Sequence, residues 1–285
     1  MTKLLVTGST GTIGRELMKA LAGTAGLDVR VGLRDPRKAA RGTSAVRLDW
    51  EDSTTFAPAL DGIERLFLLT PFVEQFERPS RALLEAAARA GVKYVVKLSA
   101  RGLTEDVPFD SGRQHARLER AVRESGMAWA FLQPTFFMDN VLTFQRLTVL
   151  EQGAFYGASG GQAVSYVSSK DVAEVAATLL ARPETYAGRA YELTGGQAVT
   201  DADIARWLGA KLGREVRFVD LPLEQYRAGL EQQGVPAWQL EALVGLEDVK
   251  RQGWASDTTS TVRELLGRAP ETFEAFLSRR GPDLG

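Results

Sequence analysis

The sequence predicts an α/β fold: a doubly wound parallel sheet with a smaller, mostly helical C-terminal lobe. Short β-rich apolar runs alternate with helical patterns through residues 1–133. The first run leads directly into a glycine-rich turn that opens a helix, and the tail after residue 222 carries helical patterns only. Strands that alternate with helices form right-handed βαβ units, which make the sheet parallel and cover both of its faces.

Six buried strands and four helices are expected in the first half of the chain. The strands are expected at residues 3–7, 28–33, 45–49, 65–70, 93–99 and 127–133. The helices between them are expected at residues 12–22, 53–60, 79–90 and 112–125. In the first helix, Ile13, Leu17 and Leu21 recur every four residues. This spacing forms one apolar stripe that packs against the sheet.

The pattern loosens from about residue 134. We expect helices at 136–150, 170–181 and 201–212, and short strands at 154–156, 163–167, 190–194 and 216–220. The tail at 223–280 reads as helical, with interruptions at Gly234, Gly253 and Gly267. Residues 1–150 are therefore expected to form a nucleotide-binding domain to which 163–194 partly returns. Residues 151–285 are expected to form mainly a substrate lobe, with an interleaved boundary.

Composition excludes several functions. The 285 residues include 35 basic and 36 acidic side chains, a net charge of −1 that argues against nucleic acid as a partner. With no cysteine and one histidine, thiol catalysis and a cysteine- or histidine-rich metal site are excluded, so we expect no metal. No apolar run is long enough to span a membrane, and the N-terminus does not resemble a signal peptide. We expect a cytoplasmic monomer or homodimer.

The strongest local motif is G-x-x-G-x-x-G at residues 8–14, directly after the first strand. Gly8 allows the tight turn, Gly11 lets the backbone approach a pyrophosphate, and Gly14 allows close contact between helix and strand. The positive end of the following helix and its N–H groups then face the phosphates. This context predicts a dinucleotide-binding, Rossmann-type domain.

The end of the second strand bears on the choice between NADP and NAD. Arg34 lies about 20 residues beyond Gly14, where an acidic residue holds the ribose of NAD and an arginine accommodates the 2′-phosphate of NADP. Its neighbour Asp35 leaves the position ambiguous by one residue. Residues 34–41 also contain Arg37, Lys38 and Arg41, and this basic surplus favours NADP(H), with NAD(H) as the alternative.

A series of motifs resembles the NmrA-like family of atypical short-chain dehydrogenase/reductases. In chain order they are VTGSTGTIGREL, LFLLTPF, AGVKYVVKLSA, the H-x-x-x-E of His115 and Glu119, SGMAWAFLQPTFFMDN, YVSSKDVAEVAA and AYELTGG. The similarity extends to about Gly267. It implies a Rossmann domain, a smaller substrate lobe and NADP. The family includes quinone and dye reductases as well as redox-sensing regulators that bind the cofactor without obvious turnover.

The resemblance implies specific cofactor contacts at the carboxyl ends of the strands, where ligands of open α/β sheets bind. It places the glycine turn on the pyrophosphate, Arg34 on the 2′-phosphate, and the segments after the third to sixth strands beside adenine, ribose and nicotinamide. The expected cofactor-binding residues are Gly8, Ser9, Thr10, Gly11, Thr12, Ile13, Gly14, Arg34, Lys38, Asp49, Trp50, Thr70, Pro71, Ser99, Pro134 and Phe136.

The usual catalytic pair of short-chain dehydrogenases is missing. When Glu119 is aligned with the glutamate that follows their Tyr-x-x-x-Lys, Ser111 occupies the tyrosine position and His115 the lysine position. A serine is a poor proton donor near pH 7, so ordinary alcohol–ketone interconversion is not expected. His115 and Ser99 are the catalytic candidates, each against a purely structural role. Lys97 shares the strand face of Ser99 and either faces the site or reaches solvent.

Hydride transfer without that pair suits acceptors whose reduced form is delocalised. We therefore predict an NADPH-dependent reductase of a planar, electron-poor small molecule, such as a quinone, a dye or a conjugated carbonyl. The main alternative is an NADP(H)-sensing regulatory protein with little or no turnover. A third is a structural protein that kept the fold, although the intact glycine turn argues against it.

Overall fold

A computed structural model describes residues 1–22 and 24–280 of the chain, which form two compact units. The first unit comprises residues 1–107, 111–133 and 172–192, and the second comprises 108–110, 134–171 and 193–285. The expected helix at 136–150 thus lies in the second unit, and the segment that returns to the first is 172–192. Only three residues separate the last strand before the boundary from the next helix, so no linker marks the change in the sequence.

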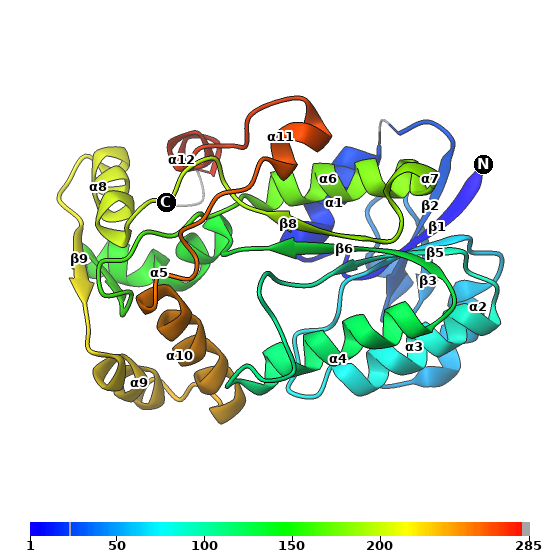
Figure 1. Ribbon diagram of the computed structural model, residues 1–285, viewed down its shortest axis with the longest axis horizontal. Coiled ribbons are helices and arrows are strands. Elements are labelled where there is room, and N and C mark those ends of the chain that lie inside the picture. Colours follow the sequence, from blue (N-terminus) through cyan, green and yellow to red (C-terminus); the bar gives the residue numbers. More distant parts are fainter. Residues whose placement is uncertain (23, 281–285) are drawn as a thin grey trace. The chain divides into compact units, whose positions relative to one another are not determined.

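A seven-stranded sheet of strand order β3-β2-β1-β4-β5-β6-β8 organises the first unit (Figure 1). Its strands are β1 (Thr2–Val6), β2 (Leu27–Leu33), β3 (Ser44–Arg47), β4 (Arg65–Leu68), β5 (Tyr94–Leu98), β6 (Ala128–Pro134) and β8 (Arg189–Leu193). The pairings from β3 through β6 are all parallel. The chain runs outward from β1 in both directions, so the strand order reverses between β1 and β4. This reversal is where Rossmann-type sheets bind their ligands.

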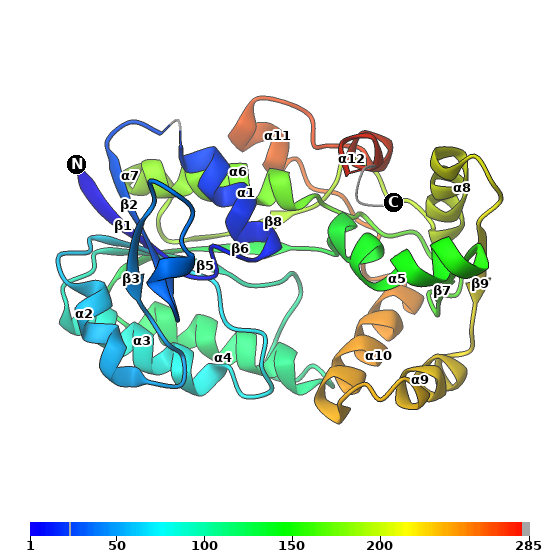
Figure 2. The ribbon, with the colours of Figure 1, turned by 180° about the vertical axis from the view of Figure 1, so that it is seen from behind.

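Helices cover both faces of this sheet. They are α1 (Thr12–Leu21), α2 (Phe56–Leu60), α3 (Glu77–Arg89), α4 (Asp110–Glu124), α6 (Ser169–Ala181) and α7 (Pro183–Tyr186), with short 3₁₀ turns η1 (Pro36–Lys38) and η2 (Ser53–Thr55). Helices α3 and α4 lie on one face, and α1 and α6 lie on the other (Figures 1 and 2). On the α3–α4 face, Leu66 and Leu68 of β4 pack with Leu83 and Leu118, all fully buried. This core holds the strand ends that carry the site.

The second unit is mostly helical, as expected. It contains α5 (Met138–Gln152), α8 (Asp201–Leu212), α9 (Leu223–Gln232), α10 (Ala237–Arg251), α11 (Thr261–Leu266) and α12 (Phe273–Arg280). Strands β7 (Ala154–Gly157) and β9 (Arg217–Asp220) form a separate parallel pair. The three tail glycines all have positive φ, between +66° and +74°, and each follows a helix closely. Their conformational freedom explains the interruptions at these positions.

The expectation of a strand at 163–167 is wrong. This segment forms only two isolated bridges, from Val164 to Val199 and from Val167 to Phe137. Val164, Tyr166 and Val167 are buried within the second unit without forming a ladder of paired strands. A short apolar run cannot by itself distinguish these two environments.

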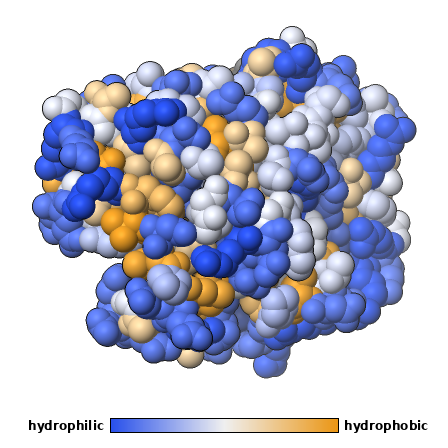
Figure 3. Space-filling view, turned by 60° about the vertical axis from the view of Figure 1, so that its left-hand side comes forward, coloured by the Kyte–Doolittle hydropathy of each residue, from blue (hydrophilic) through white to orange (hydrophobic). Residues whose placement is uncertain are grey.

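The described surface carries few large exposed hydrophobic side chains. They are Met1, Phe72 and Val73 after β4, Phe144 and Leu147 on α5, and Trp254 after α10. On the face drawn in Figure 3, hydrophobic surface forms separate groups among hydrophilic side chains. Within residues 1–22 and 24–280, none of the helices has the length and hydrophobicity needed to cross a bilayer.

Candidate functional site

The turn between β1 and α1 has the geometry expected of a phosphate cradle, and its three glycines have different roles. Gly8 has φ of +69°, a backbone conformation that residues other than glycine rarely adopt. A Cβ added to Gly14 would lie 2.0 Å from the Gly8 carbonyl oxygen, so only glycine fits there. A Cβ added to Gly11 would meet nothing nearer than that oxygen, at 3.4 Å. Gly8 and Gly14 therefore build the turn, while Gly11 keeps open the space in front of it.

The first turn of α1 faces the same open space. Gly11 is the N-cap residue and offers no side chain to the N–H groups that follow it. Such N–H groups find no acceptor within the helix and, together with the helix dipole, favour a bound anion. The segment from Ser9 to Gly14 thus fits the pyrophosphate of a dinucleotide.

Thr7 ties this turn to the neighbouring strand, at the point where the strand order reverses. Its buried hydroxyl donates to the carbonyl of Leu69 at 2.9 Å and accepts from the backbone N–H of Leu69 at 2.8 Å. Because the carboxyl ends of β1 and β4 are held together in this way, Thr70 and Pro71 follow β4 beside the glycine turn. Both are half-buried, which leaves part of each accessible to a ligand.

Arg34 and Asp35, between which the sequence left the choice of cofactor open, differ in their contacts. The Arg34 guanidinium is 68% exposed and lies 3.4 Å from the Asp49 carboxylate and 3.5 Å from that of Glu51. Asp35 instead caps η1, where its carboxylate accepts from the backbone N–H and the guanidinium of Arg37. These contacts with Arg37 lower the pKa of Asp35. Asp35 is thus occupied within its own turn, whereas Arg34 is accessible to a phosphate.

The remaining predicted residues after β2 and β3 are partly structural. Lys38 ends η1 and is exposed. Trp50 is half-buried against the core of the sheet, with its ring edge-on to that of Phe56 at a centroid distance of 6.2 Å. Asp49 is tied into the following turn through its backbone, whose N–H donates to the Thr55 hydroxyl at 3.0 Å. The structure therefore gives Trp50 and Asp49 local structural roles in addition to the adenine contact that remains a prediction.

Three polar side chains gather at the carboxyl end of β5. Ser99 is 6% exposed, and its hydroxyl has no hydrogen-bond partner among the described residues. Lys97 is fully buried, and its ammonium nitrogen donates to the Leu98 carbonyl and lies 3.1 Å from Nδ1 of His115 on α4. The idea that Lys97 reaches solvent is therefore wrong. A buried hydroxyl without a partner is costly, and a ligand at this position would satisfy it.

The electrostatics of this group are unusual. Burial lowers the pKa of Lys97 to about 7, although the nearby Glu119 carboxylate opposes that shift. Burial and the positive charge of Lys97 together hold the pKa of His115 well below its ordinary range. The His115 ring is half-buried and packs against Phe76 at a centroid distance of 4.6 Å. His115 is thus a neutral imidazole near pH 7, which can donate or accept a hydrogen bond but does not supply an acidic proton.

Pro134 and Phe136 belong to the end of β6 and the start of the second unit. The Phe136 ring lies edge-on to the Tyr166 ring, with 6.2 Å between the centroids. The Lys250 ammonium nitrogen lies 5.2 Å from the centroid of the Phe136 ring. Lys250 in turn pairs with the buried carboxylate of Glu247 at 2.6 Å. The Phe136 ring thus makes contacts within the second unit, and its role beside nicotinamide remains a prediction.

The polar cluster around Lys250 was not predicted from the sequence. Within it, the Tyr166 hydroxyl donates to Asp201 at 2.9 Å, and the second carboxylate oxygen of Asp201 has no partner among the described residues. Burial raises the pKa of Tyr166. These residues come from segments far apart in the sequence, so no local pattern could have found them. In the described part of the chain, no group of three or more histidine and acidic side chains could hold a metal ion.

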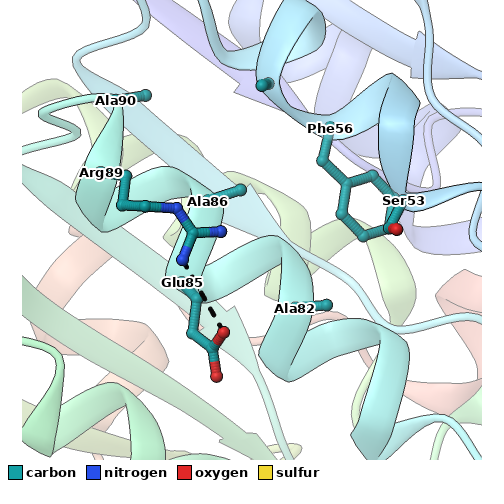
Figure 4. Close-up of a pocket in the computed structure, with 8 residues that line it drawn as sticks. Ser53, Phe56, Ala82, Glu85, Ala86, Arg89 and Ala90 are labelled. Carbon is teal, nitrogen blue, oxygen red and sulfur yellow. Dashed lines mark ion pairs between the residues drawn. The ribbon is translucent and has the colours of Figure 1, made fainter.

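A surface groove of about 350 Å³ lies between α2 and α3 (Figure 4). Phe56 lines it from α2, and an ion pair of Glu85 with Arg89 lines it from α3. None of the predicted site residues contributes to it. The groove is therefore separate from the carboxyl ends of the strands.

A family model described as NmrA-like family matches residues 1–277. The chain belongs to the NmrA-like family. A curated relative, the NAD(P)H azoreductase of Xenophilus azovorans, is 35% identical over 286 residues, 99% of each chain. The (4-alkanoyl-5-oxo-2,5-dihydrofuran-3-yl)methyl phosphate reductase of Streptomyces griseus is 34% identical over 95% of each chain.

A solved structure is similar to this chain over nearly its whole length. The NADPH-dependent quinone oxidoreductase of Escherichia coli, complexed with NADPH, aligns with a TM-score of 0.87 and 26% identity. The alignment covers 97% of this chain and 99% of that one. The expected family and fold class are both confirmed.

Proposed function

We propose that this protein is an NADPH-dependent oxidoreductase that transfers hydride to a planar, electron-poor small molecule. The observation that carries the proposal is the 35% identity to an NAD(P)H azoreductase over 99% of both chains. The similar protein of solved structure is a quinone oxidoreductase with NADPH bound, and the Streptomyces relative reduces a ring whose carbonyl is conjugated with a carbon–carbon double bond. Azo dyes, quinones and conjugated carbonyls share one property: a hydride adds to them to give a delocalised anion.

The cofactor is held by the residues at the strand ends of the first unit. The backbone from Ser9 to Gly14 binds the pyrophosphate, and Arg34 binds the 2′-phosphate. This phosphate competes for the Arg34 guanidinium with its present partners Asp49 and Glu51. Two carboxylates beside Arg34 weaken its preference for a dianion, so NADH remains a possible second cofactor. The assignment of the first unit to the cofactor and of the second to the substrate is part of the same proposal.

When bound, NADPH supplies the hydride, and the protein's residues position it. Neither Ser111 nor His115 is equipped to protonate an alkoxide, because a serine hydroxyl is a poor acid and the pKa of His115 is held low. Water therefore provides the proton to the reduced acceptor. Ser99 and His115 contribute hydrogen bonds that orient the reactants.

The alternative of a cofactor-sensing regulatory protein is not favoured, because the similar proteins described above are enzymes. We further propose a cytoplasmic location and a monomeric or homodimeric state, as expected from the sequence. A small-molecule substrate is part of the same proposal.

The test is NADPH oxidation, followed at its absorbance, with a panel of quinones, azo dyes and enones. Turnover with at least one of these classes supports the proposal. The matched control is Gly11→Val, which fills the space in front of the glycine turn and should abolish turnover. Tight NADPH binding without oxidation by any member of the panel would instead favour the sensor.

A further inference from the structure

Lys97 lies in an unusual place for a lysine. It is in β5 of a parallel sheet, and none of its side chain is exposed. Its nitrogen contacts the Leu98 carbonyl oxygen at 3.2 Å and Nδ1 of His115 at 3.1 Å. A lysine is rarely buried without a specific partner, so these contacts need a chemical explanation.

The groups around Lys97 and His115 come from helix α4, from strand β6 and from the residue before α3. Glu119, one turn beyond His115 on α4, attracts the Lys97 ammonium, and Arg123 opposes it. The Glu119 carboxylate itself accepts from Arg123 and from Gln133. Phe76, immediately before α3, packs on the His115 ring. The ring is thus held on one side by an aromatic contact and at Nδ1 by Lys97.

The chemistry of an ammonium group determines the direction of the contact with His115. At pH 6, below its pKa of about 7, Lys97 is an ammonium, which has three N–H donors and no lone pair and so can only donate. Nδ1 of His115 must then be the acceptor, and the proton of a neutral imidazole resides on the other nitrogen, Nε2.

We propose that Lys97 is a positioning residue, which donates to Nδ1 of His115 and so fixes the ring as a neutral donor through Nε2–H. That donor would bind a ligand atom carrying negative charge or a lone pair, either a cofactor hydroxyl or an oxygen or nitrogen of the acceptor. The identity of this ligand rests on the proposed function, but the tautomer of His115 does not.

Two further observations support this assignment. The same positive charge and burial that lower the pKa of His115 keep its ring neutral near pH 7. The Ser99 hydroxyl, two residues from Lys97 on the same strand face, is also buried without a partner. The carboxyl end of β5 therefore offers a ligand one hydroxyl and one imidazole N–H.

The test uses the fact that His115 is the only histidine in the chain. Nitrogen-15 NMR of histidine-labelled protein, without a histidine tag, gives one pair of ring signals that need no assignment by mutation. At pH 6, we expect a neutral ring with the proton on Nε2 and an Nδ1 signal shifted by hydrogen bonding. A proton on Nδ1, or a positively charged ring at this pH, would overturn the proposal.

The variant Lys97→Met removes the charge and keeps the length of the side chain. We expect the pKa of His115 to rise, because the positive charge that lowers it is gone, and the Nδ1 hydrogen-bond shift to be lost. The matched control is Lys93→Met, which removes an exposed lysine paired with Glu64 and should leave both signals unchanged. An unchanged His115 pKa in folded Lys97→Met contradicts the proposal, and the measurement on the unmodified protein stands even if this variant does not fold.

Kinetics provides a readout that a purely structural role would not change. The acidic limb of the pH profile of kcat should lie at higher pH in Lys97→Met than in the unmodified enzyme, because removing the Lys97 charge raises the pKa of His115. The NMR experiment needs neither cofactor nor acceptor. If no acceptor is ever reduced but the tautomer is as expected, the proposed function fails and the role of Lys97 remains.

Discussion

The carbonyl oxygen of Gly8 occupies the place that a side chain at residue 14 would need, 2.0 Å from a Cβ built on Gly14. Folding and binding are thus assigned to different glycines of one turn. We expect Gly14→Ala to lose the native fold or several kcal/mol of stability, since backbone atoms cannot move aside. Gly11→Val should fold with a near-normal melting temperature and lose NADPH binding. Calorimetric unfolding and NADPH titration separate the two outcomes, and tight binding by folded Gly11→Val would disprove the phosphate cradle.

The choice of cofactor can be tested at Arg34. Arg34→Ala should weaken NADPH binding by about 1.5–3 kcal/mol, the value of a charge-assisted hydrogen bond, and leave NADH binding almost unchanged. Titration of the protein with each cofactor measures both. The matched control is Arg37→Ala, a neighbouring arginine that pairs with Asp35. If Arg34→Ala weakens both cofactors equally, Arg34 does not contact the 2′-phosphate.

The proposal that water supplies the proton predicts mild effects at Ser111 and His115, which occupy the positions of the usual tyrosine and lysine. Ser111→Ala and His115→Ala should each retain activity, with a loss in kcat below the ~10²–10⁴-fold that removal of a general acid causes. His115→Ala should act mainly on cofactor affinity. Steady-state kinetics and NADPH titration measure the two effects. A thousandfold loss in kcat with unchanged NADPH affinity would make His115 the proton donor.

The buried pair of Lys250 and Glu247 predicts an asymmetric effect on stability. Lys250→Met leaves the Glu247 carboxylate buried, with the Ala158 N–H as its one remaining donor among the residues that the structure describes. The expected loss is about 3–5 kcal/mol in the free energy of unfolding. The double variant Lys250→Met/Glu247→Gln should recover much of that loss. Urea unfolding of the three proteins checks this, and equal losses in the single and double variants would show that the charge is not the cause.

The pKa of Lys97 predicts a dependence of stability on pH. Its folded-state pKa of about 7 lies below the ordinary value of 10.5. Between these values the unfolded chain binds more protons, so this group makes the protein more stable as pH rises. Lys97→Met removes the effect. The free energy of unfolding of Lys97→Met, relative to that of the unmodified protein, should therefore fall from pH 7 to about pH 9.5. Urea unfolding of both proteins at several pH values measures this difference. A constant difference would mean that Lys97 is not perturbed.

Much of the fold could be predicted from the sequence because the signals are local. The glycine turn, the six strands through residue 133 and the interruptions of the tail each depend on neighbouring residues. Alternation along the fifth strand predicts that Lys97 and Ser99 share one face. It could not show that His115, eighteen residues later, would meet Lys97 there, because that contact depends on how α4 packs. The cluster of Tyr166, Asp201 and Lys250 was missed for the same reason.

The chain passes between its two units five times, at residues 107/108, 110/111, 133/134, 171/172 and 192/193. No single cut separates them, so neither unit can be expressed as one continuous fragment. Transplanting the second unit from a relative with another acceptor would require exchanging three segments together, one of them only three residues long. A recombination event with one junction therefore cannot exchange the second unit, whereas point substitutions can alter it residue by residue.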